Sequence, residues 1–279
     1  MLFRSVLELE KFNDEQIRQV FSFRADTTTV DKVMDNPQLL DLARRPVMSE
    51  LILEALPEIE AGKPVDIARV YLYAVRRKME RDIKEERTFT SLADKLYFLC
   101  ELAWEMLSTE QMSLNYRLFP ERIRKLFGSV VQDEKDLDHW HYDMMGQTML
   151  IRNADGDYTP AHRSLLEFFV AYKFAAELGA LAPDFMELAQ MRSVDQSLFP
   201  SEYRWSKYFG ERSNQTAPLQ RFVSESLEVL KSGFGRDVLA KALVDLMESM
   251  LVPYDSSTEH PLINAIKSTQ ATARSEERR

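Results

Sequence analysis

The segment 149–178 constrains the fold more than any other part of the sequence, because the spacing of its apolar residues changes within it. Residues 149–152 read as a strand, the string Asn-Ala-Asp-Gly at 153–156 predicts a turn, and residues 157–160 return as a second strand. A helix over 163–178 follows with no linker, and it is so apolar that most of its sides need burial. The segment therefore predicts a small hairpin that leads directly into a core helix.

Two amphipathic helices precede this hairpin. Ser91 opens the first, whose apolar face runs from Leu92 to Leu107, and the second begins at about Pro120. The order helix, helix, hairpin, helix across 89–178 predicts a winged-helix-like module in which the hairpin is the wing.

The rest of the chain also has helical patterns. Asn13 and Gln16 have the spacing of a capping box, so we expect a helix that begins there and is broken by the threonines at 27–29. Pro46 interrupts a helical pattern, which predicts two short helices that meet at it, and Asp66 is expected to cap the next helix. With 8 glycines and 45% hydrophobic residues, the sequence predicts a mainly α-helical fold with one small β-hairpin.

The charge and cysteine content argue against several classes of protein. The net charge of −9 disfavours broad binding to nucleic acid or anionic membranes, because such binding needs clustered lysine and arginine. One cysteine, Cys100, rules out an intramolecular disulfide and is expected to be a buried apolar residue. The sequence has neither an apolar run of about 18 residues nor a signal-peptide pattern, so we expect no membrane partner and a cytoplasmic location.

No motif supplies catalytic chemistry. The phosphate-binding pattern GxxxxGK(S/T) is absent, so the chain is not expected to hydrolyse ATP by itself, and we assign no catalytic residue. His139 and His141 stand two residues apart in an acidic segment, and on a helix such positions point in different directions. We therefore expect an exposed polar segment there and no metal site. His260 lies in the C-terminal tail and is assigned no role.

His162 differs from the other histidines because it stands where the hairpin meets the helix. The first turn of a helix presents unpaired N–H groups and a partial positive charge. A histidine there can add a hydrogen-bond donor toward an anion such as phosphate. It can also cap its own helix or bond within the hairpin, and its spacing alone favours that second role.

The string DGDYTPAHRSLLEFFVAYKFA resembles the winged-helix segment of NACHT NTPases of the STAND class. In that family a hairpin with an Asp-Gly turn leads into a pattern of an aromatic residue, a histidine, a serine and a glutamate. The matching residues here are Asp155, Gly156, Tyr158, His162, Ser164, Glu167 and Phe168. Pro160 and Leu165 depart from the family's pattern, which has phenylalanine at both positions, and the proline puts the local backbone in question.

Two further segments resemble the same family. The string LLDLARRPVMSELILEALPEI is similar to its first helical domain, with Pro46 at the family's proline and Arg45 where asparagine is common. The opening LELEKFNDEQIRQVF, whose residues 2–10 alternate as a strand does, resembles the last strand of the nucleotide-binding core and the helix that leaves it. The resemblance covers about residues 3–180 and implies a chain without the Walker A half of the NTPase.

The resemblance implies a regulatory role. In the family the winged-helix histidine contacts the β-phosphate of ADP and the proline packs near the adenine, which would make His162 and Pro46 the nucleotide contacts of this chain. Exchange of ADP for ATP then releases the winged helix and permits oligomerisation, a two-state switch. The cofactor would be ATP or ADP, bound only with an NTPase half on the same or a separate chain. The resemblance implies that the switch controls a signalling pathway, and antiviral or stress defence is the expected process.

The resemblance also implies a division of the chain. Residues 1–12 would be the terminal strand of an NTPase core, and residues 13–88 a helical domain. Residues 89–182 would form the winged-helix-like domain and residues 183–253 a C-terminal helical region. The polar composition after Pro253 predicts a disordered tail over 254–279.

Two other classes of function compete with this one. A winged-helix regulator that binds DNA would need a basic recognition helix, and Arg122, Arg124 and Lys125 supply three cations in one helix. A helical adaptor would instead present the charged face of residues 67–84 or the aromatic side chains of residues 199–209 to a protein partner.

Overall fold

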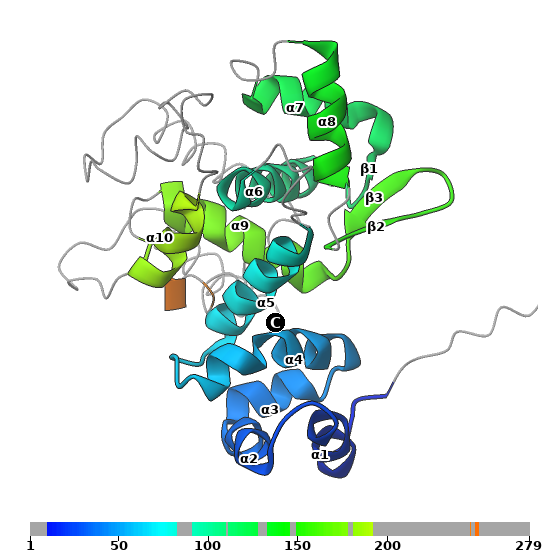
Figure 1. The fold of residues 1–279 in the computed structure, drawn as a ribbon. Helices are drawn as coiled ribbons and strands as arrows, with labels where there is room; N and C mark the ends of the chain where they lie inside the picture. Colours follow the sequence, from blue (N-terminus) through cyan, green and yellow to red (C-terminus); the bar gives the residue numbers. More distant parts are fainter. Residues whose placement is uncertain are drawn as a thin grey trace, which may run out of the picture. The chain divides into compact units, whose positions relative to one another are not determined.

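The structure is a computed structural model, and it divides into two compact units, residues 1–77 and residues 78–279 (Figure 1). The described residues are mainly helical and include one three-stranded sheet, which confirms the prediction of a mainly α-helical fold. The structure describes residues 10–82, 91–109, 111–127, 133–145, 149–177 and 181–191, together with 246, 249 and 250.

The first unit is made of helices. They are α1 (Asp14–Ser22), α2 (Thr27–Asp35), α3 (Pro37–Ala43), α4 (Pro46–Glu60) and the beginning of α5 (Ile67–Asp82), which continues across the boundary at residue 77. Consecutive helices from α1 to α4 pack on one another, and α2 also packs on α4. Buried apolar side chains from these helices form the core, among them Ile17, Phe21, Val33, Leu39 and Ile52.

Local hydrogen bonds explain where these helices begin. Asn13 and Gln16 form the predicted capping box, with bonds of 2.9 and 3.0 Å between each side chain and the other residue's backbone N–H. Helix α1 ends at Ser22, before the threonines at 27–29 that were expected to break it, and Thr27 begins α2. The carboxylate of Asp26 accepts from the backbone N–H of Thr29 at 2.7 Å and caps that helix.

The predicted division into two helices at Pro46 is confirmed, although only α3 is short and α4 has 15 residues. Helix α3 ends at Ala43, and Pro46 is the first residue of α4, where a missing N–H costs no helical hydrogen bond. Asp66 also caps α5 as predicted, since its carboxylate accepts from the backbone N–H of Arg69 at 2.9 Å.

The second unit contains the predicted hairpin. Its described elements are α6 (Leu92–Ser108), β1 (Leu114–Asn115), the 3-10 turn η1 (Tyr116–Leu118), α7 (Phe119–Phe127), α8 (Glu134–Met145), β2 (Leu150–Arg152), β3 (Asp157–Pro160), α9 (Arg163–Glu177) and α10 (Pro183–Gln190). Ser91 and Asp94 form a capping box at the start of α6. The order predicted across 89–178 was helix, helix, hairpin, helix, and the structure adds the strand β1 before α7 and the helix α8 before the hairpin.

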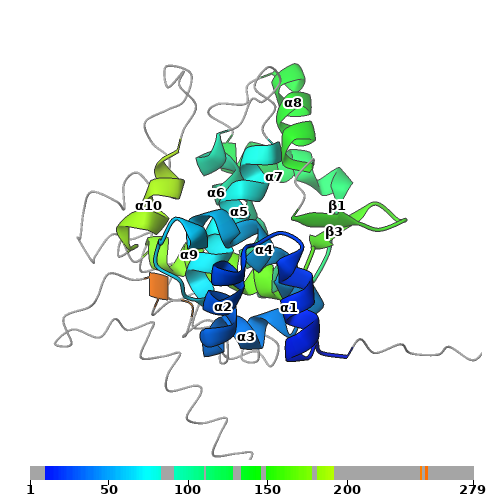
Figure 2. The same cartoon turned by 60° about the horizontal axis from the view of Figure 1, so that its bottom comes forward.

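The sheet is antiparallel with the strand order β1-β3-β2. Tyr158 of β3 lies opposite Leu114 of β1 and opposite Arg152 of β2. The hairpin of β2 and β3 projects from the helices of its unit in both views (Figures 1 and 2). Strand β1 was not predicted, because two residues are too few to carry an alternating pattern.

Helix α8 corrects a second expectation. Residues 134–145 are not an exposed polar segment but a helix with one buried face, formed by Leu137, Trp140 and Met144. The Nζ of Lys95, a buried side chain of α6, donates to the carbonyl oxygen of Asp143 at 3.0 Å in the last turn of α8. Burial lowers the pKa of Lys95, while the carboxylates of Asp143, Asp82 and Asp94 oppose that shift.

Helices α6 and α9 form the main helical interface of the second unit. Trp104 of α6 packs edge-on against Phe174 of α9, with ring centroids 5.4 Å apart. Cys100 is buried here, as expected of an apolar residue, and burial raises the pKa of its thiol well above the ordinary value. The same interface holds an ion pair between Lys173 and Glu101.

Gly156, at the tip of the hairpin, has a φ of +87°. A Cβ at this position would lie 2.8 Å from Cδ1 of Tyr116, whose ring packs under the turn. We therefore expect Gly156→Ala to lower the free energy of unfolding by about 2 kcal/mol, from the left-handed backbone and the clash together.

Gly62 is the matched control for this prediction, because its φ is +77° but a Cβ added there would meet no neighbouring atom within 4 Å. Urea unfolding of both alanine variants separates the two causes. Equal losses for Gly62→Ala and Gly156→Ala would mean that the Tyr116 contact adds nothing.

Several predicted segments lie outside the described residues. They are the strand at 2–10 except Glu10, the loop 199–209, the part of the C-terminal helical region from 192 to 253 except Leu246, Ser249 and Met250, and the tail 254–279. Among the helices that the structure describes, none has the length and apolar character needed to cross a membrane.

Candidate functional site

His162 lies between the end of β3 and the first residue of α9, and its side chain is half-buried. Its Nδ1 lies 2.6 Å from the Oγ of Ser164 and accepts from the backbone N–H of the same residue at 3.2 Å. The imidazole thus caps the first turn of α9, which is the role that spacing alone favoured for this residue.

Capping does not exclude a second role for this ring. A neutral imidazole has one donor nitrogen and one acceptor nitrogen. Because Nδ1 accepts a hydrogen bond from a backbone amide, its proton belongs on Nε2, a tautomer inferred from the hydrogen-bond geometry. His162 can therefore cap α9 with one nitrogen and donate with the other.

The backbone next to His162 accommodates Pro160 without strain. Hydrogen bonds join Ala161 to Met149 at 2.8 Å and Asn153 to Asp157 at 2.9 Å across the hairpin. Because bonded pairs alternate along an antiparallel ladder, Pro160 and its partner Leu150 occupy a position where no N–H is required. The departure from phenylalanine at Pro160 therefore leaves the hairpin intact.

Leu165, Glu167 and Phe168, which also belong to the segment that resembles the family, lie on α9. Leu165 and Phe168 are buried in α9, and the ring of Phe168 lies 5.5 Å from that of Phe169 and 6.0 Å from that of Tyr172. Glu167 pairs with Arg163 at 3.3 Å along the helix surface. The contacts given for these residues thus lie within α9 itself.

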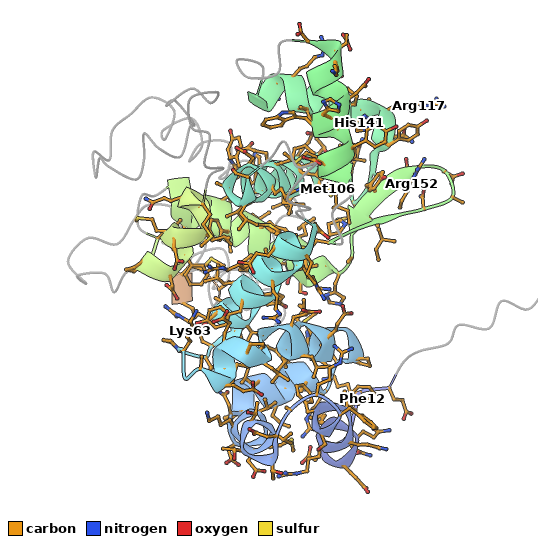
Figure 3. All side chains as sticks on the ribbon, viewed as in Figure 1. Phe12, Lys63, Met106, Arg117, His141 and Arg152 are labelled. Atoms are coloured by element: carbon orange, nitrogen blue, oxygen red, sulfur yellow. The ribbon has the colours of Figure 1, made fainter. Side chains whose placement is uncertain are left out.

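A cluster of aromatic and cationic side chains covers one part of the sheet. The guanidinium of Arg152 lies 4.9 Å from the ring centroid of Tyr116 and 5.9 Å from that of Tyr158, and Arg117 lies 5.7 Å from the Tyr116 ring. The hydrogen bond from Arg117 lowers the pKa of Tyr116. Figure 3 shows Arg117 and Arg152 on the hairpin side of the second unit. Sequence patterns missed this cluster, because it depends on pairing between β1 and β3.

Pro46, the second predicted contact, is a partly exposed residue of the first unit. The N-cap residue Arg45 makes no side-chain capping bond, and its guanidinium lies 3.8 Å from the carboxylate of Asp41. The hydroxyl of Ser49 donates to the carbonyl of Ala43 at 2.8 Å, which links α4 to the end of α3. Pro46 belongs to the first unit and His162 belongs to the second.

His141, one of the paired histidines of α8, lies beside aromatic rings. The ring of His141 lies 6.3 Å from that of Phe119 and 6.2 Å from that of Tyr142, and burial lowers its pKa while the charge of Asp138 opposes the shift. Within the described ranges, no three side chains of the metal-binding types gather into a group.

The cations of α7 face carboxylates. Arg122 donates from Nε to Glu105 of α6 at 3.0 Å, and Arg124 pairs with Glu134 at the start of α8. Helix α8, which follows α7 and packs on it, carries four carboxylates and one lysine in the string EKDLDHWHYDMM. The surface expected to bind DNA is therefore largely neutralised or acidic.

Comparison with known proteins gives one informative similarity. The chain is 67% identical over 278 residues to an uncharacterized WD repeat-containing protein of Nostoc sp. (strain PCC 7120). The match covers 97% of this chain and 18% of that protein, so the chain spans less than a fifth of the length of its relative. No family model matches the sequence.

Proposed function

We propose that this chain is the regulatory part of a NACHT-type STAND signalling NTPase, and that it senses whether ADP or ATP is bound. Three segments of the sequence support the proposal by their order, from the opening strand pattern through Pro46 to His162. In this proposal the chain acts with a nucleotide-binding part on the same or a separate polypeptide. Nucleotide exchange releases the winged-helix-like module and permits self-association.

The observation that carries the proposal is the geometry of His162. Its ring stands at the hairpin-helix junction, and its Nδ1 is engaged by the first turn of α9. In this tautomer the proton is on Nε2, and an N–H donor of this kind suits a phosphate oxygen. In this proposal His162 senses ADP and stabilises the ADP-bound state, because its hydrogen bond to the phosphate is made only in that state.

The test is nucleotide retention by the chain produced together with its nucleotide-binding part. We expect His162→Ala to increase the rate of ADP release about tenfold or more, because a hydrogen bond to a charged group is lost. Release is measured with a fluorescent ADP analogue and a chase of unlabelled ADP, and self-association is followed by light scattering.

His260→Ala is the matched control, because His260 has no assigned role. It should leave ADP release unchanged. If His162→Ala also leaves both ADP release and self-association at the wild-type level, the sensor role is rejected.

The DNA-binding alternative has less support. In helix-turn-helix modules the second helix of the motif enters the major groove. The helix expected in this role is α7, whose Arg122 and Arg124 already pair with carboxylates. The adjoining α8 exposes Glu134 and Asp138, which carry the same charge as phosphates. We expect no binding of a labelled duplex at low salt, and salt-dependent binding there would favour the DNA-binding regulator over the NTPase proposal.

The relative from Nostoc is much longer than this chain. Its name describes WD repeats, whereas the present sequence has no Trp-Asp dipeptide and its described residues are mainly helical. We propose that WD repeats joined to a chain of this kind serve as the module that binds the trigger, and that the regulatory part transmits that binding to the nucleotide. The adaptor alternative stays open for residues 199–209, which lie outside the described ranges.

A further inference from the structure

Ser164 makes two contacts with one nitrogen of His162. Its Oγ lies 2.6 Å from Nδ1, and its backbone N–H points to the same atom at 3.2 Å. Ser164 is itself a buried residue in the first turn of α9, between the exposed Arg163 and the buried Leu165. The helix therefore determines where the hydroxyl lies relative to the imidazole.

These contacts decide which nitrogen of the imidazole carries the proton. A backbone N–H can only donate, so it requires an unprotonated Nδ1. The hydroxyl group can donate or accept, and beside an unprotonated Nδ1 it donates. Both contacts then favour the same tautomer, with the proton on Nε2.

We propose that Ser164 is a positioning residue that holds His162 in the Nε2–H tautomer. The class of ligand that this tautomer fits is an anion with oxygen acceptors, such as the phosphates of a nucleotide. The opposite tautomer would direct a lone pair from Nε2 toward those oxygens and repel them. The identity of the ligand rests on the proposed function, whereas the tautomer itself does not.

The tautomer can be measured on the full chain without nucleotide. Long-range proton–nitrogen NMR correlation on isotope-labelled histidine distinguishes a protonated ring nitrogen from an unprotonated one. A buffer of about pH 8 keeps an ordinary histidine neutral, since its pKa is about 6.5. The chain has 4 histidines, and the signal that disappears in His162→Gln belongs to His162.

The wild-type spectrum should show His162 with its proton on Nε2. In Ser164→Ala the fraction of the opposite tautomer should rise about fivefold, the effect of one hydrogen bond of ordinary net strength. Ser164→Thr keeps the hydroxyl and should restore the wild-type ratio. Ser164→Asp should invert the ratio, because a carboxylate accepts from Nδ1–H and is also favourable in the first turn of a helix.

An equal mixture of tautomers, or a proton on Nδ1, in the wild-type chain overturns the proposal whatever the variants do. So does a tautomer ratio that neither Ser164→Ala nor Ser164→Asp alters, when circular dichroism shows that both are folded. The ADP-release assay separates this proposal from the proposed function. If the Ser164 variants change the tautomer ratio but His162→Ala leaves the rate of ADP release unchanged, the proposed function alone is rejected. If His162→Ala changes the rate of ADP release but the Ser164 variants leave the tautomer ratio unchanged, the positioning role of Ser164 alone is rejected.

Discussion

Glu101→Gln is expected to lower the free energy of unfolding by about 3 kcal/mol, because it removes the carboxylate that pairs with the buried ammonium of Lys173. The side chain of Lys173 is 2% exposed and that of Glu101 is 14% exposed, so water reaches little of either group. Their Nζ and Oε1 atoms form an ion pair between α9 and α6. Glutamine has nearly the same shape as glutamate, so the loss reports on the charge and not on packing.

Urea unfolding followed by circular dichroism measures this loss. The informative control is the double variant Glu101→Leu with Lys173→Met, which removes both charges and keeps apolar volume in the interface. Replacing a whole buried ion pair in this way is often neutral or stabilising, so the double variant should lie within about 1 kcal/mol of the wild type or above it. A loss for Glu101→Gln of less than about 1 kcal/mol would mean that Lys173 finds other compensation.

Phe119→Ala is expected to destabilise the protein by about 3–5 kcal/mol. Phe119 is the first residue of α7 and is fully buried. Its ring lies 5.6 Å from that of Phe98 in α6, 5.2 Å from that of Tyr158 in β3 and 6.3 Å from that of His141 in α8. Removing this ring leaves a cavity where two other helices and the sheet meet.

Phe23→Ala is the matched control, because the Phe23 side chain is 79% exposed. A surface substitution of this kind should change the unfolding free energy by no more than about 0.5 kcal/mol. Phe119→Leu should fall between the alanine variant and the wild type, since it keeps part of the apolar volume. Similar losses for Phe119→Ala and Phe23→Ala would contradict the central place assigned to Phe119.

The features predicted correctly from the sequence depend on neighbouring residues. Asn13 and Ser91 begin their helices because each side chain bonds to a backbone N–H three residues later. Pro46 begins α4 because proline lacks the N–H that a helix interior needs. The hairpin follows from a turn at Gly156, where φ is positive. Such bonds form within a few residues, so a local pattern contains the information.

The features that were missed depend on residues far apart in the chain. Strand β1 exists because Leu114 meets Tyr158, and its two residues have no pattern of their own. Helix α8 was predicted to be a polar segment because only three apolar side chains form its buried face. A lysine of α6 donates a hydrogen bond to a carbonyl oxygen in its last turn, and the sequence pattern does not show that contact. No spacing rule pairs Lys173 with Glu101, which is 72 residues away.

The candidate site divides in the same way. The sequence by itself determined that His162 stands at a hairpin-helix junction and that Pro46 begins a helix. Turns, helix caps and prolines act on residues that are only a few positions apart in the sequence. The capping of α9 by His162 through Ser164, two residues away, is a local contact of the same kind. Only the tertiary structure decided that the pairing of β2 with β3 tolerates Pro160 and that α9 packs on α6. The physical reason is that strand pairing and a buried surface are set by the atoms that surround a residue in space, wherever those atoms lie in the sequence.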